Sequence, residues 1–413
     1  MKTIIVAPFW ADKQHLSTRR TSRFVRWLQN VETEIVLVRG GSRDSVISQP
    51  WGVEISVRDP LGLRKEPEDP KEEIQKQYNP IVQFISDIVF NPDPGIVWAK
   101  RASKHPAVLD HGAGADFVIA SSPPPSALVA AAKLSDAVGG RFIVDMRDGW
   151  LDEPLKLLLQ SSRLQRFREG RLERRILDRA DRIFVTSGVW KYLLAERRSE
   201  TASKITVLTN GYPDDPVLFQ KETTKQRGKN EIRLLYTGRL SGSRSTQHPD
   251  YLLKPLLEGI KDYESGGEVV IVGALTANDK DVLEKWQEPL HRVGWRLILQ
   301  PPVPREKVPE VLAGADGLLL LCASQAAIPS KVFEYIPSRK PIFSVSEKGS
   351  AIWDLGKDLP QFFQYNLSRL AEKDTKCVRD FLEACQGKDL DYVVPEDYSD
   401  EILSGVFLKG TVK

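Results

Sequence analysis

Two segments of the sequence carry side chains that suit a phosphate-bearing ligand. The first is Leu234–Arg244, in which an apolar run ends near Gly238 and two arginines follow, Arg239 and Arg244. Glycine lets a backbone approach phosphate oxygens closely, and arginine offers planar, paired hydrogen-bond donors to them. The alternative is a surface turn that bears two solvated arginines.

The second segment, Ile328–Pro341, follows the strongest apolar run of the C-terminal half. Pro329 suits the first position of a helix, so we expect Ser330 and Lys331 at an exposed helix N-terminus. Glu334 falls one turn later on the same face, where a carboxylate can accept hydrogen bonds from the two hydroxyls of a ribose. The alternative is a short surface helix with a solvated Lys–Glu pair.

The N-terminal half offers groups for a hydroxyl-bearing partner. Asp145, Arg147 and Asp148 follow an apolar run, and two carboxylates that bracket an arginine can orient sugar hydroxyls or act as a base. A structural corner of ion pairs is the alternative. Upstream, the segment Ser121–Ser126 ends another apolar run and opens a helical stretch, which brings the hydroxyl of Ser122 toward the same edge.

A further candidate follows the first apolar run of the chain. His15, Arg19 and Arg20 lie there, where an acceptor or a phosphate would meet the N-terminal half. His15 has no partner that the sequence identifies, so a solvated loop histidine is the alternative. The aspartate pairs elsewhere in the chain lie in polar stretches away from strand ends, so we expect no metal site.

All these candidates follow strand-like runs, and this placement indicates the fold. Short β-branched apolar runs alternate with amphipathic stretches of helical length, a pattern typical of βαβ units and buried parallel sheets. We expect an α/β protein with two doubly wound, Rossmann-like sheets that face a cleft, because such sheets bind ligands beyond the carboxyl ends of their strands. The expected strands are Ile4–Val6, Glu34–Val38, Phe117–Ala120, Arg141–Asp145, Arg182–Thr186, Ile205–Leu208, Ile232–Tyr236, Val269–Val272, Arg296–Leu299, Gly317–Leu321 and Pro341–Val345.

Chain length and local composition predict the domain boundaries. At about 150 residues per domain, 413 residues make two large domains or three ordinary ones. The polar, proline-containing stretch 213–230 is typical of a linker. We therefore expect one domain over residues 1–212, a second over 231–395 and a helical tail over 396–413.

Composition excludes several classes of protein. The 59 basic and 56 acidic residues leave a net charge of +3, which gives no general attraction to nucleic acid. The 3 cysteines form no C-x-x-C pair, which argues against a disulfide framework and a cysteine-ligated zinc site. No run of about 18 apolar residues predicts a transmembrane span, and the apolar start ends at Asp12 without a cleavage site. We expect a cytoplasmic protein.

Taken in order, the segments resemble the retaining glycosyltransferases of the GT-B fold, in particular the family 4-like enzymes of bacterial polysaccharide and glycolipid assembly. The resemblance spans about residues 1–365, with residues 41–94 poorly matched. It rests on Ser121–Ser126 (SSPPPS), Asp145–Trp150 (DMRDGW), Leu172–Ser187 (LERRILDRADRIFVTS), Ile205–Gly211 (ITVLTNG), Tyr236–Leu240 (YTGRL) and Pro329–Pro341 (PSKVFEYIPSRKP).

The resemblance implies an enzyme that moves a sugar from a nucleoside-diphosphate sugar to a saccharide, lipid-linked or small glycoside acceptor. Residues 1–212 would bind the acceptor and residues 231–395 the donor, without a resident cofactor or metal. The implied donor-site residues are Gly238, Arg239, Arg244, Ser330, Lys331 and Glu334, and the implied acceptor-site residues are His15, Arg19, Ser122, Arg147 and Asp148.

The implied mechanism follows from electrostatics. Breaking the bond between sugar and diphosphate leaves negative charge on the phosphate, which Arg239 and Arg244 would stabilise as fixed cations. The acceptor hydroxyl would attack from the side of the leaving group, a phosphate oxygen would take its proton, and Asp148 would orient the acceptor. We therefore expect Asp148, Arg239 and Arg244 to be the catalytic residues.

Three departures from the family pattern keep other functions open. Ala326 stands where the family often has a glutamate, Gly149 replaces the usual proline, and the glycine-rich loop is missing between Trp10 and Thr21. A non-catalytic nucleotide-sugar-binding module is therefore an alternative. An epimerase on the same fold is another, although the 5 histidines show no cluster suited to acid–base chemistry.

One stretch of the chain is strongly basic. Between Leu155 and Arg182 there are nine basic and four acidic residues, with several leucines among them. Such a surface suits peripheral contact with the anionic headgroups of a membrane. The alternative is a solvated helix face above core leucines.

Overall fold

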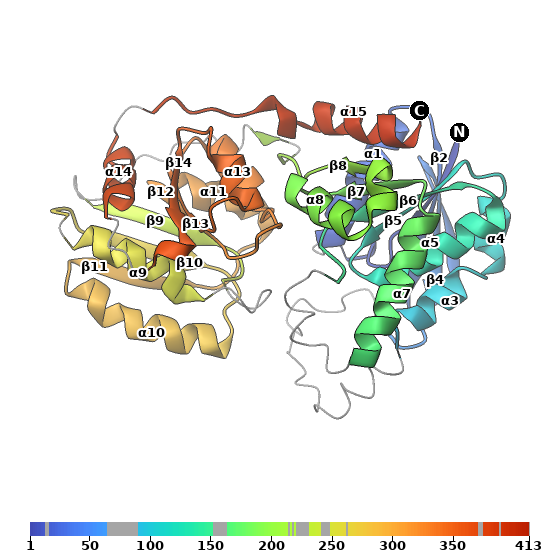
Figure 1. The fold of residues 1–413 in the computed structure, drawn as a ribbon, viewed down its shortest axis with the longest axis horizontal. Helices are drawn as coiled ribbons and strands as arrows, with labels where there is room; N and C mark the ends of the chain where they lie inside the picture. Colours follow the sequence, from blue (N-terminus) through green and yellow to red (C-terminus); the bar gives the residue numbers. More distant parts are fainter. Residues whose placement is uncertain are drawn as a thin grey trace. The chain divides into compact units, whose positions relative to one another are not determined.

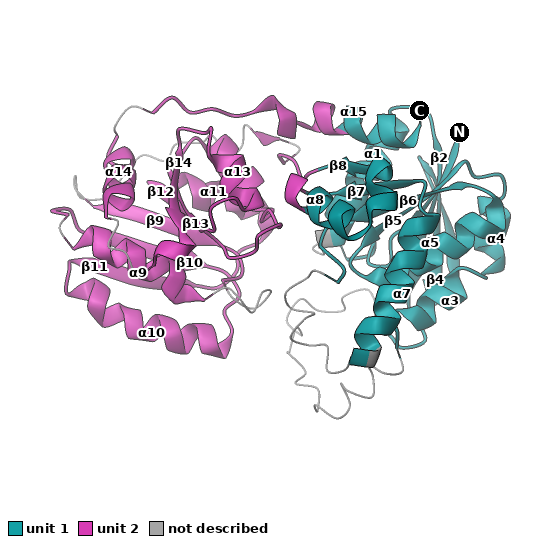
Figure 2. Cartoon of the chain, in the orientation of Figure 1, with its two compact units in different colours: residues 1–186, 190–208, 404–413 teal, residues 187–189, 209–403 magenta. Residues whose placement is uncertain are grey.

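The chain folds into two compact units, each with its own sheet (Figure 1, Figure 2). The structure is a computed structural model that describes residues 1–12, 16–63, 90–151, 163–213, 215–216, 219, 231–240, 248–261, 263–370, 375–387 and 390–412. Unit 1 comprises Met1–Thr186, Trp190–Leu208 and Ser404–Lys413, and unit 2 comprises Ser187–Val189 and Thr209–Leu403. Most of the predicted linker 213–230 lies outside the described residues.

Unit 1 is built on an eight-stranded sheet with the order β3-β4-β2-β1-β5-β6-β7-β8. Neighbouring strands run parallel, except that β3 pairs antiparallel with β4. The strands are β1 (Lys2–Val6), β2 (Glu34–Gly41), β3 (Ser45–Gln49), β4 (Gly52–Arg58), β5 (Phe117–Ser122), β6 (Arg141–Met146), β7 (Arg182–Val185) and β8 (Ile205–Val207).

Helix α5 (Pro125–Val138) shows how local sequence sets the helices of unit 1. Proline occupies its first turn, and Gly139 ends it with φ 74°, a left-handed conformation that favours glycine. The helix packs on β5, β1 and β6. The other helices are α1 (Leu16–Gln29), α3 (Ile96–Ala102), α4 (Pro106–Gly112), α7 (Arg163–Arg179), α8 (Gly188–Arg197) and the 3₁₀ turn η1 (Ser199–Lys204).

The C-terminal helix α15 (Asp400–Thr411) passes from unit 2 into unit 1 (Figure 2). The ring of Phe407 stacks on that of Phe24 in α1, with centroids 4.6 Å apart, and its side chain is completely buried. Part of the stretch predicted as a separate tail, 396–413, is thus a piece of the unit 1 core. The buried aromatic contacts of Phe407 account for this placement.

Unit 2 has a six-stranded sheet in the order β11-β10-β9-β12-β13-β14, and every neighbouring pair is parallel. Its strands are β9 (Ile232–Thr237), β10 (Gly267–Val272), β11 (Trp295–Gln300), β12 (Gly317–Cys322), β13 (Ile342–Ser346) and β14 (Phe362–Asn366). Its helices are α9 (Pro249–Ile260), α10 (Ala277–His291), α11 (Val308–Ala313), α12 (Val332–Tyr335), α13 (Ala351–Gly356) and α14 (Lys376–Cys385), with 3₁₀ turns η3 (Arg305–Lys307), η4 (Ile336–Ser338), η5 (Leu367–Arg369) and η6 (Glu396–Tyr398).

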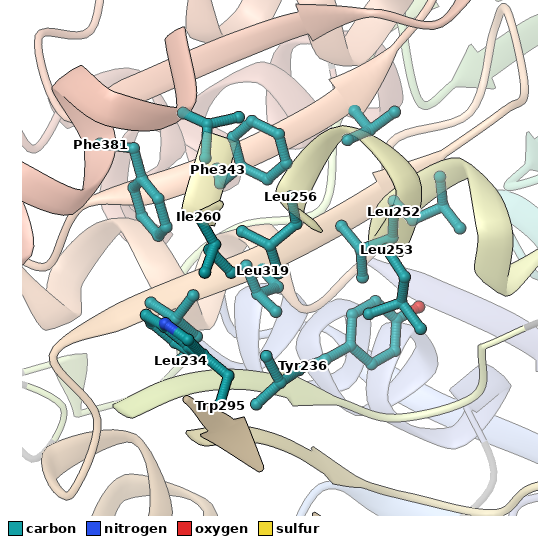
Figure 3. Packing of buried hydrophobic residues seen from close by; sticks show 14 of the residues in the cluster. Leu234, Tyr236, Leu252, Leu253, Leu256, Ile260, Trp295, Leu319, Phe343 and Phe381 are labelled. Carbon is teal, nitrogen blue, oxygen red and sulfur yellow. The ribbon is translucent and has the colours of Figure 1, made fainter. Parts of the chain in front are cut away.

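Both faces of this sheet are buried, which explains why its strands are continuously apolar. Leu234 and Leu319 pack in a cluster with residues of α9 and α14, whereas their neighbours Leu235 and Leu318 pack in a second cluster with residues of α11, α12 and α13. Figure 3 shows the first cluster, in which Leu252 and Leu256 of α9 cover the strands. Successive strand residues point to opposite faces, so two covered faces require an unbroken apolar run.

All the strands predicted from apolar runs are present. Strands β3, β4 and β14 were not predicted, because β3 is largely exposed, β4 contains Glu54 and β14 is only partly buried. Helix α1, which carries four arginines, was not predicted either. The predicted architecture of two doubly wound parallel sheets is confirmed for the residues that the structure describes.

Candidate functional site

The strand order of unit 2 reverses between β9 and β12. The chain adds β10 and β11 on one side of β9, then crosses over to add β13 and β14 beyond β12. Open parallel sheets bind ligands beyond the carboxyl ends of the strands at such a reversal. The segments that leave these two strands are the turn at Gly238 and residues 323–331, which contain four of the predicted donor residues, Gly238, Arg239, Ser330 and Lys331.

The turn after β9 requires glycine. Gly238 has φ +88°, a conformation that side chains rarely adopt, and its N–H donates to the carbonyl of Val272 over 2.8 Å. A Cβ at Gly273 would lie 2.1 Å from the Gly238 carbonyl oxygen, so the turns after β9 and β10 pack backbone to backbone. This turn is therefore closely fixed at the end of the sheet, as a phosphate-binding backbone must be.

Lys331 extends its amine to this turn. The Nζ atom lies 3.6 Å from the centre of the Tyr236 ring and 3.6 Å from where a Cβ of Gly238 would be. It is buried and has no hydrogen-bond partner among the described residues. Burial lowers the pKa of Lys331 to about 7, opposed by the nearby Glu334 and Cys322. An unpaired buried amine is costly, and an anion at the turn would supply its missing partner.

Tyr335 holds the two segments together. Its hydroxyl accepts a hydrogen bond from the N–H of Thr237 over 3.0 Å, and it lies 3.0 Å from the hydroxyl of the same threonine. Tyr335 is completely buried, and burial raises the pKa of its phenol well above the ordinary range. The last residue of β9 is thereby tied to α12, directly before the Gly238 turn.

Glu334 and Ser330 differ in exposure. The carboxylate of Glu334 is largely buried and lies 3.8 Å from the guanidinium of Arg305, whereas Ser330 is exposed. The helix expected to begin at Pro329 in fact begins at Val332 and has 4 residues, followed by η4. Residues 329–331 instead form a turn whose carbonyls accept from the first helical N–H groups, so the predicted helix start was wrong by three residues.

Of the two predicted arginines, the structure describes one. Arg239 is exposed and directly follows Gly238, and its carbonyl accepts a hydrogen bond from the Tyr236 hydroxyl over 2.9 Å. Arg244 lies outside the described residues. The structure thus brings Gly238, Arg239 and Lys331 together in unit 2, one helical turn from Glu334.

In unit 1 the strand order reverses between β1 and β5, and a buried ion pair lies at that edge. The guanidinium of Arg20 donates to both carboxylate oxygens of Asp145, at 2.8 and 3.2 Å, and to the carbonyl of Leu208 at 2.7 Å. The hydroxyl of Ser121 donates to the same carboxylate over 2.7 Å. Asp145 and Arg20 are therefore partners in a buried ion pair, the alternative that the sequence also left open for Asp145.

Arg147 and Asp148 lie just beyond that ion pair. Arg147 donates to the carbonyl of Pro123 over 2.7 Å, while its Nε is buried without a partner among the described residues. Burial lowers the pKa of the Arg147 guanidinium, and Asp148 and Asp145 oppose this effect. Asp148 is half-buried, and no side chain of the described residues hydrogen-bonds to its carboxylate.

The two residues that follow Asp148, Gly149 and Trp150, pack closely against other elements of unit 1. A Cβ at Gly149 would lie 2.0 Å from the ring of Trp190, so a proline at this position would collide with the indole. Trp150 is buried and donates to the carboxylate of Glu169 over 3.1 Å. The replacement of the family's proline by Gly149 thus has a packing reason in this chain.

The remaining predicted acceptor residues divide into three cases. Ser122 is buried and its carbonyl accepts from the N–H of Arg147 over 3.0 Å, which places it beside Asp148. Arg19 is half-buried on α1, and His15 lies outside the described residues. Their roles as acceptor contacts stay predictions.

Sequence reasoning missed Tyr335 and Arg305. Tyr335 follows Glu334 in the same motif, and an aromatic residue there resembles ordinary core. Arg305 lies in the polar turn η3, with no signal in the sequence that would pair it with Glu334. In the part of the chain that the structure describes, no three His, Cys, Asp or Glu side chains gather as metal ligands would. None of the helices described has the length and apolar character needed to cross a membrane.

Comparison with protein families gives an independent assignment of the N-terminal half. Residues 17–211 match the model of the family described as "Glycosyl transferase 4-like domain". These residues are thus similar to a glycosyltransferase 4-like domain. The matched stretch runs from α1 to just beyond β8 and includes Ser122, Arg147 and Asp148. The predicted resemblance to glycosyltransferases is confirmed. No curated protein matches the chain in sequence.

Solved structures extend the similarity over both units. Sucrose-phosphate synthase from Thermosynechococcus elongatus superposes with TM-score 0.63 at 12% identity, covering 99% of this chain and 98% of its own. Anabaena HepE in complex with UDP gives TM-score 0.57 at 12% identity, covering 99% of each chain. The lipopolysaccharide outer core galactosyltransferase WaaB gives 0.52 at 13%, also covering 99% of each. The two units thus have the GT-B fold, and the matched residues 17–211 lie mainly in unit 1.

Proposed function

We propose that the protein transfers a sugar from a nucleoside-diphosphate sugar to a hydroxyl-bearing saccharide, lipid-linked or small glycoside acceptor, with retention at the anomeric carbon. The observation that carries this proposal is the buried amine of Lys331 beside the Gly238 turn, at the strand reversal of unit 2, for which the described residues provide no hydrogen-bond partner. The family match in unit 1 and the UDP bound to the structurally similar HepE support it.

The donor diphosphate would lie at the Gly238 turn. Arg239 is exposed beside the turn, and Lys331 reaches it from α12, so two cations face the charge that develops on the leaving diphosphate. Arg244 is proposed as a further cation on the same loop. The Glu334 carboxylate, held near Arg305, would accept hydrogen bonds from the donor ribose.

The acceptor would be oriented in unit 1. Asp148 has a carboxylate without a hydrogen-bond partner among the described side chains, whereas Asp145 is neutralised by Arg20. We therefore assign the orientation of the acceptor hydroxyl to Asp148, with Arg147 and Ser122 beside it. The attacking hydroxyl would pass its proton to an oxygen of the leaving diphosphate, and no resident cofactor takes part in this scheme.

A panel of nucleoside-diphosphate sugars tests the proposal. Thermal shift reports binding, and release of free nucleoside diphosphate reports turnover. Arg239→Ala and Glu334→Ala are expected to weaken donor binding at least ten-fold, because each removes a charged partner of the ligand. Arg292→Ala, which removes an exposed arginine of unit 2 that pairs with Glu288, is the matched control.

Two outcomes would contradict the proposal. If Arg239→Ala and Glu334→Ala left affinity and turnover intact, the donor site would be assigned wrongly. If a nucleoside diphosphate raised the melting temperature and no donor released diphosphate, the protein would be a nucleotide-sugar-binding module. Ala326, which stands where the family often has a glutamate, is the feature of this sequence that favours the binding module as the alternative.

We further propose that helix α7 contacts an anionic membrane surface. Its exposed side chains include Arg171, Arg174 and Arg175 and the aromatic ring of Phe167, which is 63% exposed. Of its acidic residues, Glu169 and Glu173 are buried, and the exposed Asp178 pairs with Arg198. A cationic face with an exposed aromatic ring suits a layer of anionic headgroups.

Liposome flotation tests this contact. Wild-type protein should float with vesicles that contain a third of phosphatidylglycerol and remain at the bottom with neutral phosphatidylcholine. The charge reversal Arg171→Glu with Arg175→Glu should abolish flotation, while Arg292→Glu in unit 2 should not. Equal recovery with neutral vesicles, or an unaffected double variant, would contradict the proposal.

A further inference from the structure

The amine of Lys331 is the buried charged group that the described structure leaves least satisfied. Its Nζ atom is shielded from solvent, and none of the described residues offers it a hydrogen-bond acceptor. Burying an unpaired ammonium is costly enough that such a group usually neutralises instead. The donor-free protein therefore favours an uncharged amine at a place where a diphosphate needs a cation.

We propose that Lys331 is a proton-coupled switch for donor binding: at mildly alkaline pH the amine is largely neutral in the donor-free protein and takes up a proton from solvent when the donor diphosphate arrives. The proposal rests on the donor site proposed above. The proton adds to the amine lone pair and gives the ammonium that pairs with the incoming phosphate oxygen, so no other reactant is needed.

Geometry supports this role. Gly238 lacks a side chain, and a Cβ there would be 3.6 Å from Nζ, so the amine faces the backbone turn without an intervening group. The Tyr236 ring lies beneath Nζ at 3.6 Å, and an aromatic face accommodates an ammonium once it forms. The amine is thus held between a surface that tolerates the charge and the turn where the anion would bind.

The charged and titratable groups near Lys331 determine the balance between its neutral amine and its ammonium form. Burial lowers the pKa of Lys331 to about 7, which outweighs the opposing effects of Glu334 and Cys322. A diphosphate within about 5 Å would raise the pKa again by roughly 1–3 units. The groups beside the amine are Glu334 of α12, Cys322 of β12 and Tyr236 of β9, with Arg305 of η3 paired to Glu334. Two further titratable or charged groups belong to the same segments: Tyr335, whose hydroxyl contacts Thr237, and the exposed Arg239, which follows Gly238.

Calorimetric titration with UDP in buffers of different ionisation enthalpy measures the proton directly. With a pKa near 7 that rises by about two units, we expect uptake of about 0.8 proton at pH 8 and about 0.1 at pH 6. Affinity for UDP should fall roughly ten-fold between pH 7 and 8.5. The terminal phosphate of UDP titrates near this range, so the variants below provide the correction.

Three variants separate Lys331 from other titrating groups. Lys331→Met should bind UDP more weakly and without the uptake at pH 8, whereas Lys331→Arg keeps its charge at every pH and should bind without uptake. Lys285→Met, at an exposed position on α10, should behave as wild type.

A second measurement works without any ligand. Between about pH 7 and 10 the unfolded chain binds a proton that the folded chain lacks at Lys331, so stability rises with pH across this window. The urea midpoint of the wild type minus that of Lys331→Met should therefore increase from pH 7 to 9.

The results distinguish the two proposals. If UDP binds with the same proton uptake in wild type and Lys331→Met, the donor site stands and the switch is refuted. A pH-independent difference in stability between these two proteins also refutes it. If neither UDP nor any other nucleoside diphosphate binds the wild type, the donor site and the switch fail together.

Discussion

Asp145 and Asp148 lie three residues apart, yet substitution by asparagine should affect different properties. Asp145→Asn should lower the stability of unit 1, whereas Asp148→Asn should lower turnover. Asp145→Asn removes the charge that neutralises the buried Arg20, whose guanidinium lies 2.8 Å from the carboxylate. Removing one partner of a buried ion pair typically costs about 3–5 kcal/mol, because the other charge stays buried. With a urea m-value of about 2 kcal/mol per M, the unit 1 midpoint should fall by about 2 M.

Asp148→Asn is the matched partner of this experiment. Asp148 is half-buried and without a hydrogen bond to a described side chain, so the unfolding free energy should change by less than about 0.5 kcal/mol. Turnover should fall by about 10²–10⁴, the usual contribution of a positioned acid–base or orienting group, while the affinity for UDP is unchanged.

The assay is a urea titration followed by tryptophan fluorescence, with separate fits for the transitions of the two units, combined with diphosphate release at saturating donor. The reasoning is refuted if Asp145→Asn lowers the midpoint by less than about 0.5 M. It is also refuted if Asp148→Asn unfolds as easily as Asp145→Asn, since that would make both carboxylates structural.

Other substitutions follow from packing. Gly149→Ala should destabilise unit 1 by about 1–3 kcal/mol, because the added Cβ meets the Trp190 ring at 2.0 Å, and a thermal melt measures this. Tyr335→Phe should cost about 1–3 kcal/mol in unit 2 and weaken UDP binding, since the buried N–H of Thr237 loses its acceptor. Phe407→Ala should cost about 3–5 kcal/mol in urea unfolding of unit 1, although it lies near the end of the chain.

Substitutions at matched positions with open surroundings serve as controls for these predictions. Gly188→Ala adds a Cβ that meets nothing within 4 Å, and Tyr192→Phe and Phe167→Ala alter rings that are 64% and 63% exposed. Each should leave stability within about 0.5 kcal/mol of wild type. A loss at these exposed positions equal to that at the buried ones would contradict the packing argument.

The amino-acid sequence was sufficient to predict the sheet architecture. Runs such as Leu318–Leu321 are apolar at every position because both faces of the sheet are covered, and this pattern survives in a single sequence. Strand β3 has no such run, since Val46 and Ile47 are exposed at the sheet edge, and β14, at the edge of the other sheet, is only partly buried. Local pattern could not predict them.

The sequence also placed the candidate residues at strand ends, yet side-chain partners depended on the tertiary structure. Asp145 and Asp148 look equivalent in the segment DMRDGW, and only the fold brings Arg20, which is 125 residues away from Asp145, into a buried pair with one of them. The pairing depends on α1 lying across the end of β6, a long-range arrangement that no local spacing contains.

For Lys331, too, the sequence determines some properties and the tertiary structure determines others. The sequence gives the residue type and its position near a predicted strand end. These properties are equally compatible with a solvated, charged lysine and with a lysine whose amine is buried. The tertiary structure encloses Nζ between the Tyr236 ring and the Gly238 turn, and no residue in the described part of the chain offers it a hydrogen-bond partner. Burial and the loss of water as a partner are properties of packing, so the folded chain alone decides whether this lysine is charged.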